Sequence, residues 1–168
     1  MKFLVKDIGL EAFKDLIDKE QKAIEFKSVP IDAHSYVPSK PVAVQAPKVT
    51  IKDQDAFELW KATNLIPQKQ KGYVAIGIKV LLGDFYTDKA RFLADLVKEY
   101  AAGEIRLTLR QNIIIPFVKE ELLPYFYQEL EKLGFVEAGY NKAVDITACP
   151  GTDTCNLGIA SSTGIAVE

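Results

Sequence analysis

Apolar and polar residues follow two different periods along this chain, and after Gly72 the periods succeed each other in a regular order. From Tyr73 to Leu82 the large apolar side chains stand at every second position, which predicts a strand. The following segment, from Thr87 to about Ala102, repeats its apolar residues at helical spacing, and we expect Thr87 to cap that helix and Gly103 to stop it. Strand and helix thus follow one another over short distances.

The same patterns predict four further elements downstream. They are a strand over residues 104–110, a strand over 113–118, a helix over 119–133 that ends at Gly134, and a short strand over 143–147. The order from Tyr73 to Thr147 is therefore β-α-β-β-α-β. This order predicts an α+β fold of the ferredoxin-like class, an antiparallel sheet with both helices on one face. The opposite sheet face is then left open and needs cover from an N-terminal arm, a partner or a ligand.

Before Gly72 the pattern changes twice. A helix is predicted from Gly9 to about Glu25, prolines interrupt the stretch between Ser28 and Thr50, and a second helix is predicted over residues 53–65. We divide the chain into an N-terminal helix (1–27), a linker or arm (28–55), the ferredoxin-like domain (56–147) and a C-terminal segment (148–168).

Composition and charge narrow the classes of function. The 168 residues are 48% hydrophobic and carry a net charge of −2, which argues against binding nucleic acid through phosphate neutralisation. We expect no membrane span, because no window approaches 18 apolar residues, and the first residues carry no signal peptide. Two cysteines without an export signal fit a reducing compartment, so we expect a cytoplasmic protein.

The predicted strand over 104–110 carries the first candidate for chemistry. Strict alternation places Arg106, Thr108 and Arg110 on the face opposite Ile105, Leu107 and Leu109. Guanidinium groups bind carboxylates and phosphates through paired hydrogen bonds, so this face suits a ligand with several such groups. The periodicity alone favours a plainer interpretation, a polar strand surface in contact with solvent.

The second candidate is the pair Cys149 and Cys155, the only cysteines in the chain. Thiolates are soft ligands that suit iron–sulfur clusters, zinc or copper. The spacing is wider than the Cys-x2-Cys common at zinc sites. Spacing alone leaves three alternatives open: half of a metal site, two free buried thiols, or a local disulfide.

The two candidates together resemble one family. The string from Glu104 to Ile115 (EIRLTLRQNIII), followed by Ala148 to Ala160 (ACPGTDTCNLGIA), is similar to the nitrite/sulfite reductase family. Its members are sirohaem and 4Fe-4S enzymes that reduce nitrite or sulfite by six electrons, built from two pseudo-symmetric halves. The resemblance covers most of the chain: residues 1–20 resemble the helix closing the first half, the proline-rich stretch the linker between halves, and residues 56–147 the second ferredoxin-like domain.

The resemblance implies roles for seven residues. Cys149 and Cys155 would be two of the four 4Fe-4S ligands. A second set would line the sirohaem pocket, with the arginines meeting porphyrin carboxylates or substrate: Arg106, Thr108, Arg110, Gln111 and Asn112. The resemblance names no catalytic residue in this chain, because the active-site basic residues of the family come largely from the first half.

Departures from the family pattern shape further expectations. The chain has neither a third nor a fourth cysteine and lacks a first half, so we expect a fragment that needs the rest of the reductase as its partner. Alone, we expect it to be inactive and to bind neither cofactor, because two metal bonds offset little of the entropy of ordering a loop. Its uncovered sheet face favours self-association. The sequence distinguishes neither nitrite from sulfite nor one electron donor from another.

Other functions stay open beside the reductase. A non-catalytic ferredoxin-like module could bind a small ligand or a protein on its open sheet face, with incidental cysteines. RNA binding fits less well, because the chain is acidic and lacks paired aromatic residues on the Arg106 strand. A small zinc protein would need ligands that only a dimer of this chain supplies.

Overall fold

The computed structural model describes residues 2–25, 45 and 47–167. The chain divides into two compact units, residues 1–36 and 37–168. Most of the predicted linker or arm over 28–55 lies outside the described residues.

The N-terminal unit contains two helices where the sequence predicted one. Helix α1 spans Lys2–Ile8 and α2 spans Leu10–Ala23. The chain breaks between them at Gly9, whose φ is 82°. None of the residues of α2 is buried, so its apolar stripe is exposed within the described part of the chain.

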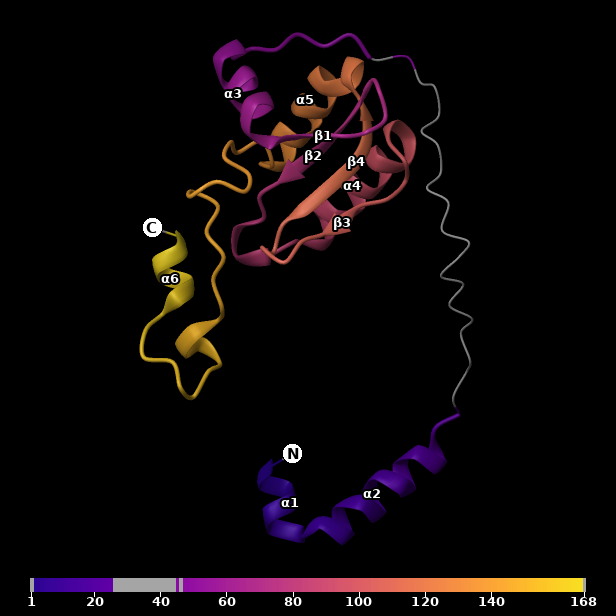
Figure 1. The fold of residues 1–168 in the computed structure, drawn as a ribbon, viewed down its shortest axis with the longest axis vertical. Helices are drawn as coiled ribbons and strands as arrows, with labels where there is room; N and C mark the ends of the chain where they lie inside the picture. The colour runs from indigo at the N-terminus through magenta and orange to yellow at the C-terminus, as the bar shows by residue number, and fades with distance from the viewer. Residues whose placement is uncertain (1, 26–44, 46, 168) are drawn as a thin grey trace. The chain divides into compact units, whose positions relative to one another are not determined.

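The second unit is built on an antiparallel sheet (Figure 1). Its strands are β1 (Leu65–Pro67), β2 (Tyr73–Ile78), β3 (Arg106–Leu107) and β4 (Ile113–Lys119), in the spatial order β1-β2-β4-β3. The last three are the first three strands of the predicted ferredoxin-like order, and they lie as that fold requires, with the third strand between the other two.

The edge strand beside β2 comes from an unexpected part of the chain. Residues 143–147, predicted as the last strand, form no strand, and β1 pairs with β2 instead. The register joins Leu65 to Ile76 and Pro67 to Val74. A strand that precedes β2 in the chain therefore takes the place of the strand predicted over residues 143–147. The proline ends this short edge strand, a position where a missing amide hydrogen is tolerated.

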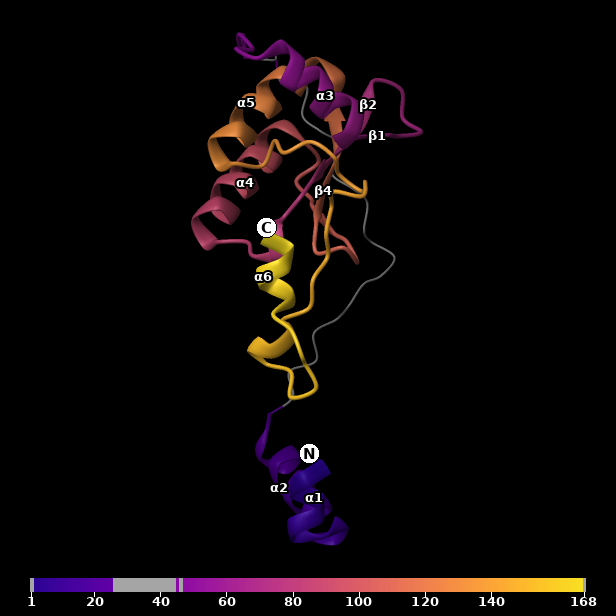
Figure 2. The same cartoon turned by 90° about the vertical axis from the view of Figure 1, so that its left-hand side faces the viewer.

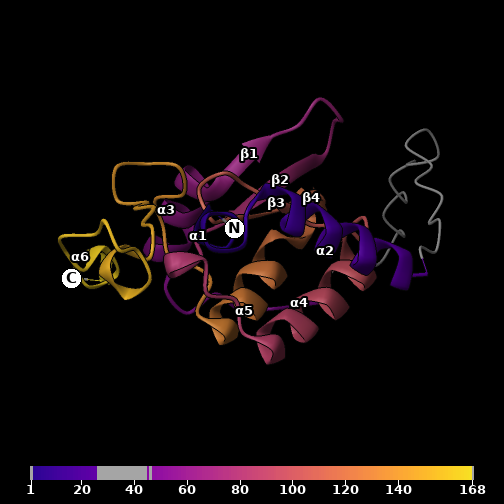
Figure 3. The ribbon, with the colours of Figure 1, turned by 90° about the horizontal axis from the view of Figure 1, so that it is seen from below.

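Two helices cover one face of the sheet, as the sequence predicted. Helices α4 (Thr87–Tyr100) and α5 (Leu123–Leu133) lie side by side on that face (Figures 2 and 3). Tyr86 holds the N-cap position of α4, so the prediction that Thr87 caps this helix is wrong. Short 3₁₀ helices, η1 (Leu81–Gly83) and η2 (Glu120–Leu122), follow β2 and β4.

Helix α3 (Gln54–Asn64) completes the helical layer. Asp53 caps its N-terminus by accepting a hydrogen bond from the amide of Ala56 at 2.9 Å. Its aromatic residues Phe57 and Trp60 pack against Tyr127 of α5, with ring centroids 5.0 and 5.2 Å from that ring.

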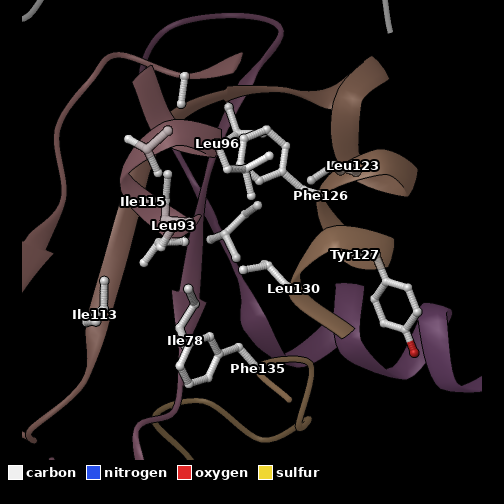
Figure 4. Packing of buried hydrophobic residues seen from close by; sticks show 14 of the residues in the cluster. Ile78, Leu93, Leu96, Ile113, Ile115, Leu123, Phe126, Tyr127, Leu130 and Phe135 are labelled. Atoms are coloured by element: carbon white, nitrogen blue, oxygen red, sulfur yellow. The ribbon is translucent and has the colours of Figure 1, made fainter. Parts of the chain in front are cut away.

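The core lies between the sheet and these helices. Figure 4 shows the isoleucines of β2 and β4 facing the leucines and aromatic residues of α4 and α5. Ile76, Ile115 and Phe126 are fully buried there. Complete burial of such side chains contributes about 1.5–3 kcal/mol each, which explains why the helices dock on this face.

The C-terminal segment follows α5 and an irregular stretch of chain, and its described residues add no strand to the sheet. It contains η3 (Gly151–Asp153) and α6 (Ser162–Val167). Among the helices that the structure describes, none combines the length and the apolar character needed to cross a bilayer.

Candidate functional site

The arginine segment forms a tight hairpin between β3 and β4. Arg106 pairs with Ile114 and Leu107 with Ile113. The Thr108 amide donates a hydrogen bond to the Asn112 carbonyl at 2.9 Å, which closes the turn. Thr108 Oγ1 accepts hydrogen bonds from the amides of Arg110 and Asn112, both at 3.2 Å, and so holds the turn from within.

This turn overturns part of the predicted strand over 104–110. Alternation stops at Leu107, because the chain reverses direction from Thr108 onward. Leu107 is 80% exposed and Leu109 is 102% exposed, so neither side chain faces the core. Periodicity located the strand but could not show where it turned.

Both arginines of the hairpin are exposed to solvent. Arg106 forms an ion pair with Glu104, with Nη2 and Oε1 3.0 Å apart. Glu104 is held near the protein interior, and its second oxygen, Oε2, is buried with no hydrogen-bond partner among the residues that the structure describes. The Arg110 guanidinium lies close enough to Tyr140 to influence its ionisation. The hairpin therefore presents two guanidinium groups that could bind an anionic ligand.

Gln111 and Asn112 direct their side chains toward the protein. Gln111 pairs with the backbone of Ala148: its Nε2 donates to the carbonyl at 2.9 Å, and its Oε1 accepts from the amide at 3.3 Å. Asn112 is only 2% exposed. Its side-chain Nδ2 donates to both carboxylate oxygens of Asp145, at 2.9 and 2.8 Å, and its Oδ1 accepts from the amide of Val80 at 2.9 Å.

These contacts bring the cysteine segment to the arginine hairpin. Gln111 and Ala148 stand 37 positions apart in the chain. Because Cys149 follows Ala148 directly, the hairpin and the first cysteine belong to one local arrangement. The sequence placed both in a single site only through family resemblance.

Cys149 and Cys155 are exposed free thiols that flank η3. Cys149 Sγ lies 3.5 Å from Ser162 Oγ, and Ser162 also donates a hydrogen bond to the Cys149 carbonyl at 2.8 Å. The hydrogen bond from Ser162, followed by one from the backbone of Gly151, lowers the pKa of the Cys149 thiol. Such a shift favours the thiolate, the form that binds soft metals.

Sequence reasoning missed Tyr140, which lies over the sheet face opposite α4 and α5. A Cβ added at Gly77 in β2 would come within 2.5 Å of the Tyr140 ring, so only glycine fits beneath it. Burial, assisted by the charge of Asp145, raises the pKa of Tyr140, and Arg110 partly opposes that shift. A glycine inside a strand was the available signal, because it often marks close approach by another group.

Comparison with known proteins assigns a family to the part of the chain that holds the arginine hairpin. Residues 66–133 match the family model described as "Nitrite/Sulfite reductase ferredoxin-like half domain". The chain carries a half domain of the nitrite/sulfite reductase family. The family that the sequence motifs resembled is thereby confirmed, as is the ferredoxin-like fold class.

Relatives from plants and bacteria extend the similarity over nearly the whole chain. The chain is 28% identical to the chloroplastic ferredoxin–nitrite reductase of Betula pendula over 172 residues, covering 100% of this chain and 26% of that protein. Identity to the ferredoxin–nitrite reductase of Synechococcus elongatus is 25% over 157 residues, covering 94% and 26%. Identity to sulfite reductase [ferredoxin] 2 of Mycolicibacterium paratuberculosis is 24% over 162 residues, covering 96% and 25%.

The candidate site lies only partly within the nitrite/sulfite reductase half domain. The chain spans about a quarter of the length of these relatives. The matched range 66–133 includes the whole arginine hairpin, whereas Tyr140, Cys149 and Cys155 follow it. The hydrogen bonds of Gln111 and Asn112 connect the two parts.

Proposed function

We propose that the chain takes part in the reduction of nitrite or sulfite by a sirohaem- and 4Fe-4S-dependent reductase. One observation carries the proposal: the Gln111–Ala148 contact joins the arginine hairpin to the cysteine segment. Cations for an anionic ligand and thiols for a metal thus occur together, as such a reaction requires. The relatives, which are named as nitrite and sulfite reductases, support the same chemistry.

The cysteine segment has the donor chemistry that an iron–sulfur cluster needs. Cys149 and Cys155 are free and exposed, and thiolate is the usual ligand of such clusters. Within the described ranges, no three His, Cys, Asp or Glu side chains gather in a way that could hold a metal ion. We therefore assign the two thiols to part of a ligand set and propose that other polypeptide supplies the remaining ligands.

The hairpin has the charge that sirohaem and the substrate anion need. We assign Arg106 and Arg110 to the carboxylates of the porphyrin or to the anion itself, since guanidinium forks bind both. The Arg106–Glu104 ion pair restrains one of the two guanidinium groups before a ligand arrives. Thr108, Gln111 and Asn112 hold the hairpin and its neighbouring loop in shape. When bound, the cofactors would carry electrons from the donor to the anion.

The electron donor we propose is ferredoxin, which is part of the names of the plant, cyanobacterial and mycobacterial relatives. We assign the surface arginines to the anion or the porphyrin, and we assign no residue to the binding of ferredoxin.

Point substitutions at the chromosomal gene test the proposal, because they need no assumption about the length of the natural protein. We expect Cys149→Ser and Arg110→Ala to lower the sirohaem absorbance and iron content of the tagged protein purified from its own cells. Extracts should lose nitrite or sulfite reduction with a chemical electron donor. Arg91→Ala, at an exposed arginine of α4, is the matched control and should change neither quantity.

Two results would contradict the reductase. One is an unsubstituted protein without iron or sirohaem, and the other is full reduction of both anions by the Cys149→Ser extract. The first result would favour a second function, a non-catalytic protein-binding module. The almost fully exposed Leu107 and Leu109 on the hairpin support that alternative, since such side chains are common at protein interfaces.

A further inference from the structure

The side chain of Gln111 makes the kind of contact that a neighbouring strand would make. Its amide group offers a donor and an acceptor with the spacing of a peptide group, and both bind the backbone of Ala148. The donor–acceptor distances are 2.9 and 3.3 Å. Two bonds to one residue fix both its position and its orientation, whereas one bond would leave it free to rotate.

The structure leaves room for this side chain at Gly83 of η1. A Cβ added at Gly83 would lie 3.2 Å from Cβ of Gln111, closer than most real contacts. Gly83 therefore lets the stem of Gln111 pass beside η1 toward Ala148. The backbone of Gln111 has a φ of 62°, so the turn directs this residue away from the regular strand path.

Other hairpin residues bind the same short segment. Asn112 donates to Asp145 with both distances below 3 Å, at 2.9 and 2.8 Å. Thr147 Oγ1 donates to the Arg110 carbonyl at the longer distance of 3.5 Å. Of these contacts, the one at Gln111 lies nearest to Cys149 in the chain.

We propose that Gln111 is a positioning residue, whose amide sets the place of the Cys149 thiol relative to Arg106 and Arg110. Ala148 is the last residue before the thiol, and Ser162 holds the Cys149 carbonyl from the other side at 2.8 Å. Without Gln111, the segment from Thr147 to Cys149 keeps its anchors at Thr147 and at the Cys149 carbonyl but loses both bonds that hold Ala148. This role rests on the proposed function for its purpose, although the positioning itself does not require a cofactor.

Two substitutions test the side chain of Gln111 without disturbing the backbone turn at this position. Gln111→Gly removes the amide and suits the positive φ, so the turn is kept without strain. Gln111→Asn also tolerates that φ and keeps the amide group, but it is one methylene shorter and falls short of Ala148. The matched control is Gln70→Gly, at an exposed glutamine in the turn before β2.

Nuclear magnetic resonance on the whole chain measures the contact directly. We expect Gln111→Gly and Gln111→Asn to speed hydrogen exchange of the Ala148 amide about tenfold, while the amides of β2 and β4 stay protected. A spin label on Cys149, in a Cys155→Ser background, should broaden the amides of Thr108 and Asn112. That broadening should weaken in both Gln111 variants and persist in Gln70→Gly.

The broadening reports position rather than stability, so a residue that only supported the fold would not change it selectively. Unchanged Ala148 exchange and unchanged broadening in both variants would overturn the proposal. Loss of protection throughout β2 and β4 would also overturn it, because Gln111 would then support the whole fold. The experiment contains no cofactor, so its failure would leave the reductase proposal standing, and failure of the gene substitutions would not decide the role of Gln111.

Discussion

Cys149 shows how a single neighbouring side chain can favour the thiolate form, which binds metals and reacts with electrophiles. Its sulfur lies 3.5 Å from the Ser162 hydroxyl, and this hydrogen bond is the largest cause that lowers the pKa of the thiol. Ser162 has one hydroxyl hydrogen, which it can donate to the sulfur instead of the Cys149 carbonyl when the thiol ionises, and a hydrogen bond donated to the thiolate stabilises the charged form. Since the thiolate is the reactive species, Cys149 should react readily below the ordinary thiol pKa.

Ser162→Ala should therefore raise the pKa of Cys149. Below the ordinary thiol pKa of about 8.5, less thiolate would form, so alkylation by iodoacetamide should slow. Well above that pH, the parent and Ser162→Ala should react alike, because Cys149 is ionised in both proteins. Mass spectrometry of the Cys149 peptide, in a Cys155→Ser background, measures the rate against pH.

Ser161→Ala is the control for this measurement, because Ser161 bonds to Thr163 and Gly164 instead of Cys149. Equal alkylation rates for Ser162→Ala and the parent at every pH would show that the hydroxyl does not tune the thiol.

At the scale of elements, Asn112 joins three parts of the chain that the sequence separates. It lies immediately before β4, accepts a hydrogen bond from the amide of Val80 beyond the end of β2, and donates twice to Asp145. Asp145 also accepts from the amide of Asn141 at 2.7 Å, which folds its own loop. A buried polar network of this kind is stable only while each member keeps its partners.

Asn112→Ala should lower the free energy of unfolding by about 3 kcal/mol, since it leaves the buried Val80 amide and Asp145 carboxylate short of partners. Urea denaturation followed by circular dichroism measures the change. Asn156→Ala, at an exposed asparagine, should stay within about 0.5 kcal/mol of the parent. A loss at Asn112 no larger than at Asn156 would mean that the network adds nothing to stability.

In the unit over residues 37–168 as a whole, the notable property is a set of apolar side chains that the described residues leave exposed. Leu107 and Leu109 protrude from the hairpin, and Leu157 and Ile159 are likewise exposed in the cysteine segment. Exposed apolar groups favour association when they lie close together. The self-association expected from the sequence therefore stays a prediction, with the hairpin as its first candidate surface.

The purified chain should show concentration-dependent association in sedimentation velocity, and the double substitution Leu107→Ser with Leu109→Ser should reduce it. Leu59→Ser is a matched control, because Leu59 is an exposed leucine on α3. Association that is equally strong in the double variant would exclude the hairpin as the contact. A parent chain that stays monomeric at all concentrations would contradict the prediction itself.

The sequence by itself determined the features that depend on neighbouring residues. Period-two and helical patterns located β2, β4, α4 and α5, and their order predicted the ferredoxin-like class. The motifs around Arg106 and Cys149 were sufficient to identify the family, because each is continuous in the chain. This information lies in the spacing of neighbouring residues and does not depend on contacts between distant parts of the chain.

Only the tertiary structure decided the features that depend on distant contacts. It placed β1 at the sheet edge in place of residues 143–147, ended β3 at Leu107, and put Tyr140 over Gly77. It also turned Gln111 toward Ala148, 37 positions away. Alternation along one strand cannot show where a partner strand ends or which loop returns to cover it, since pairing and burial are properties of segments that meet only in the folded chain.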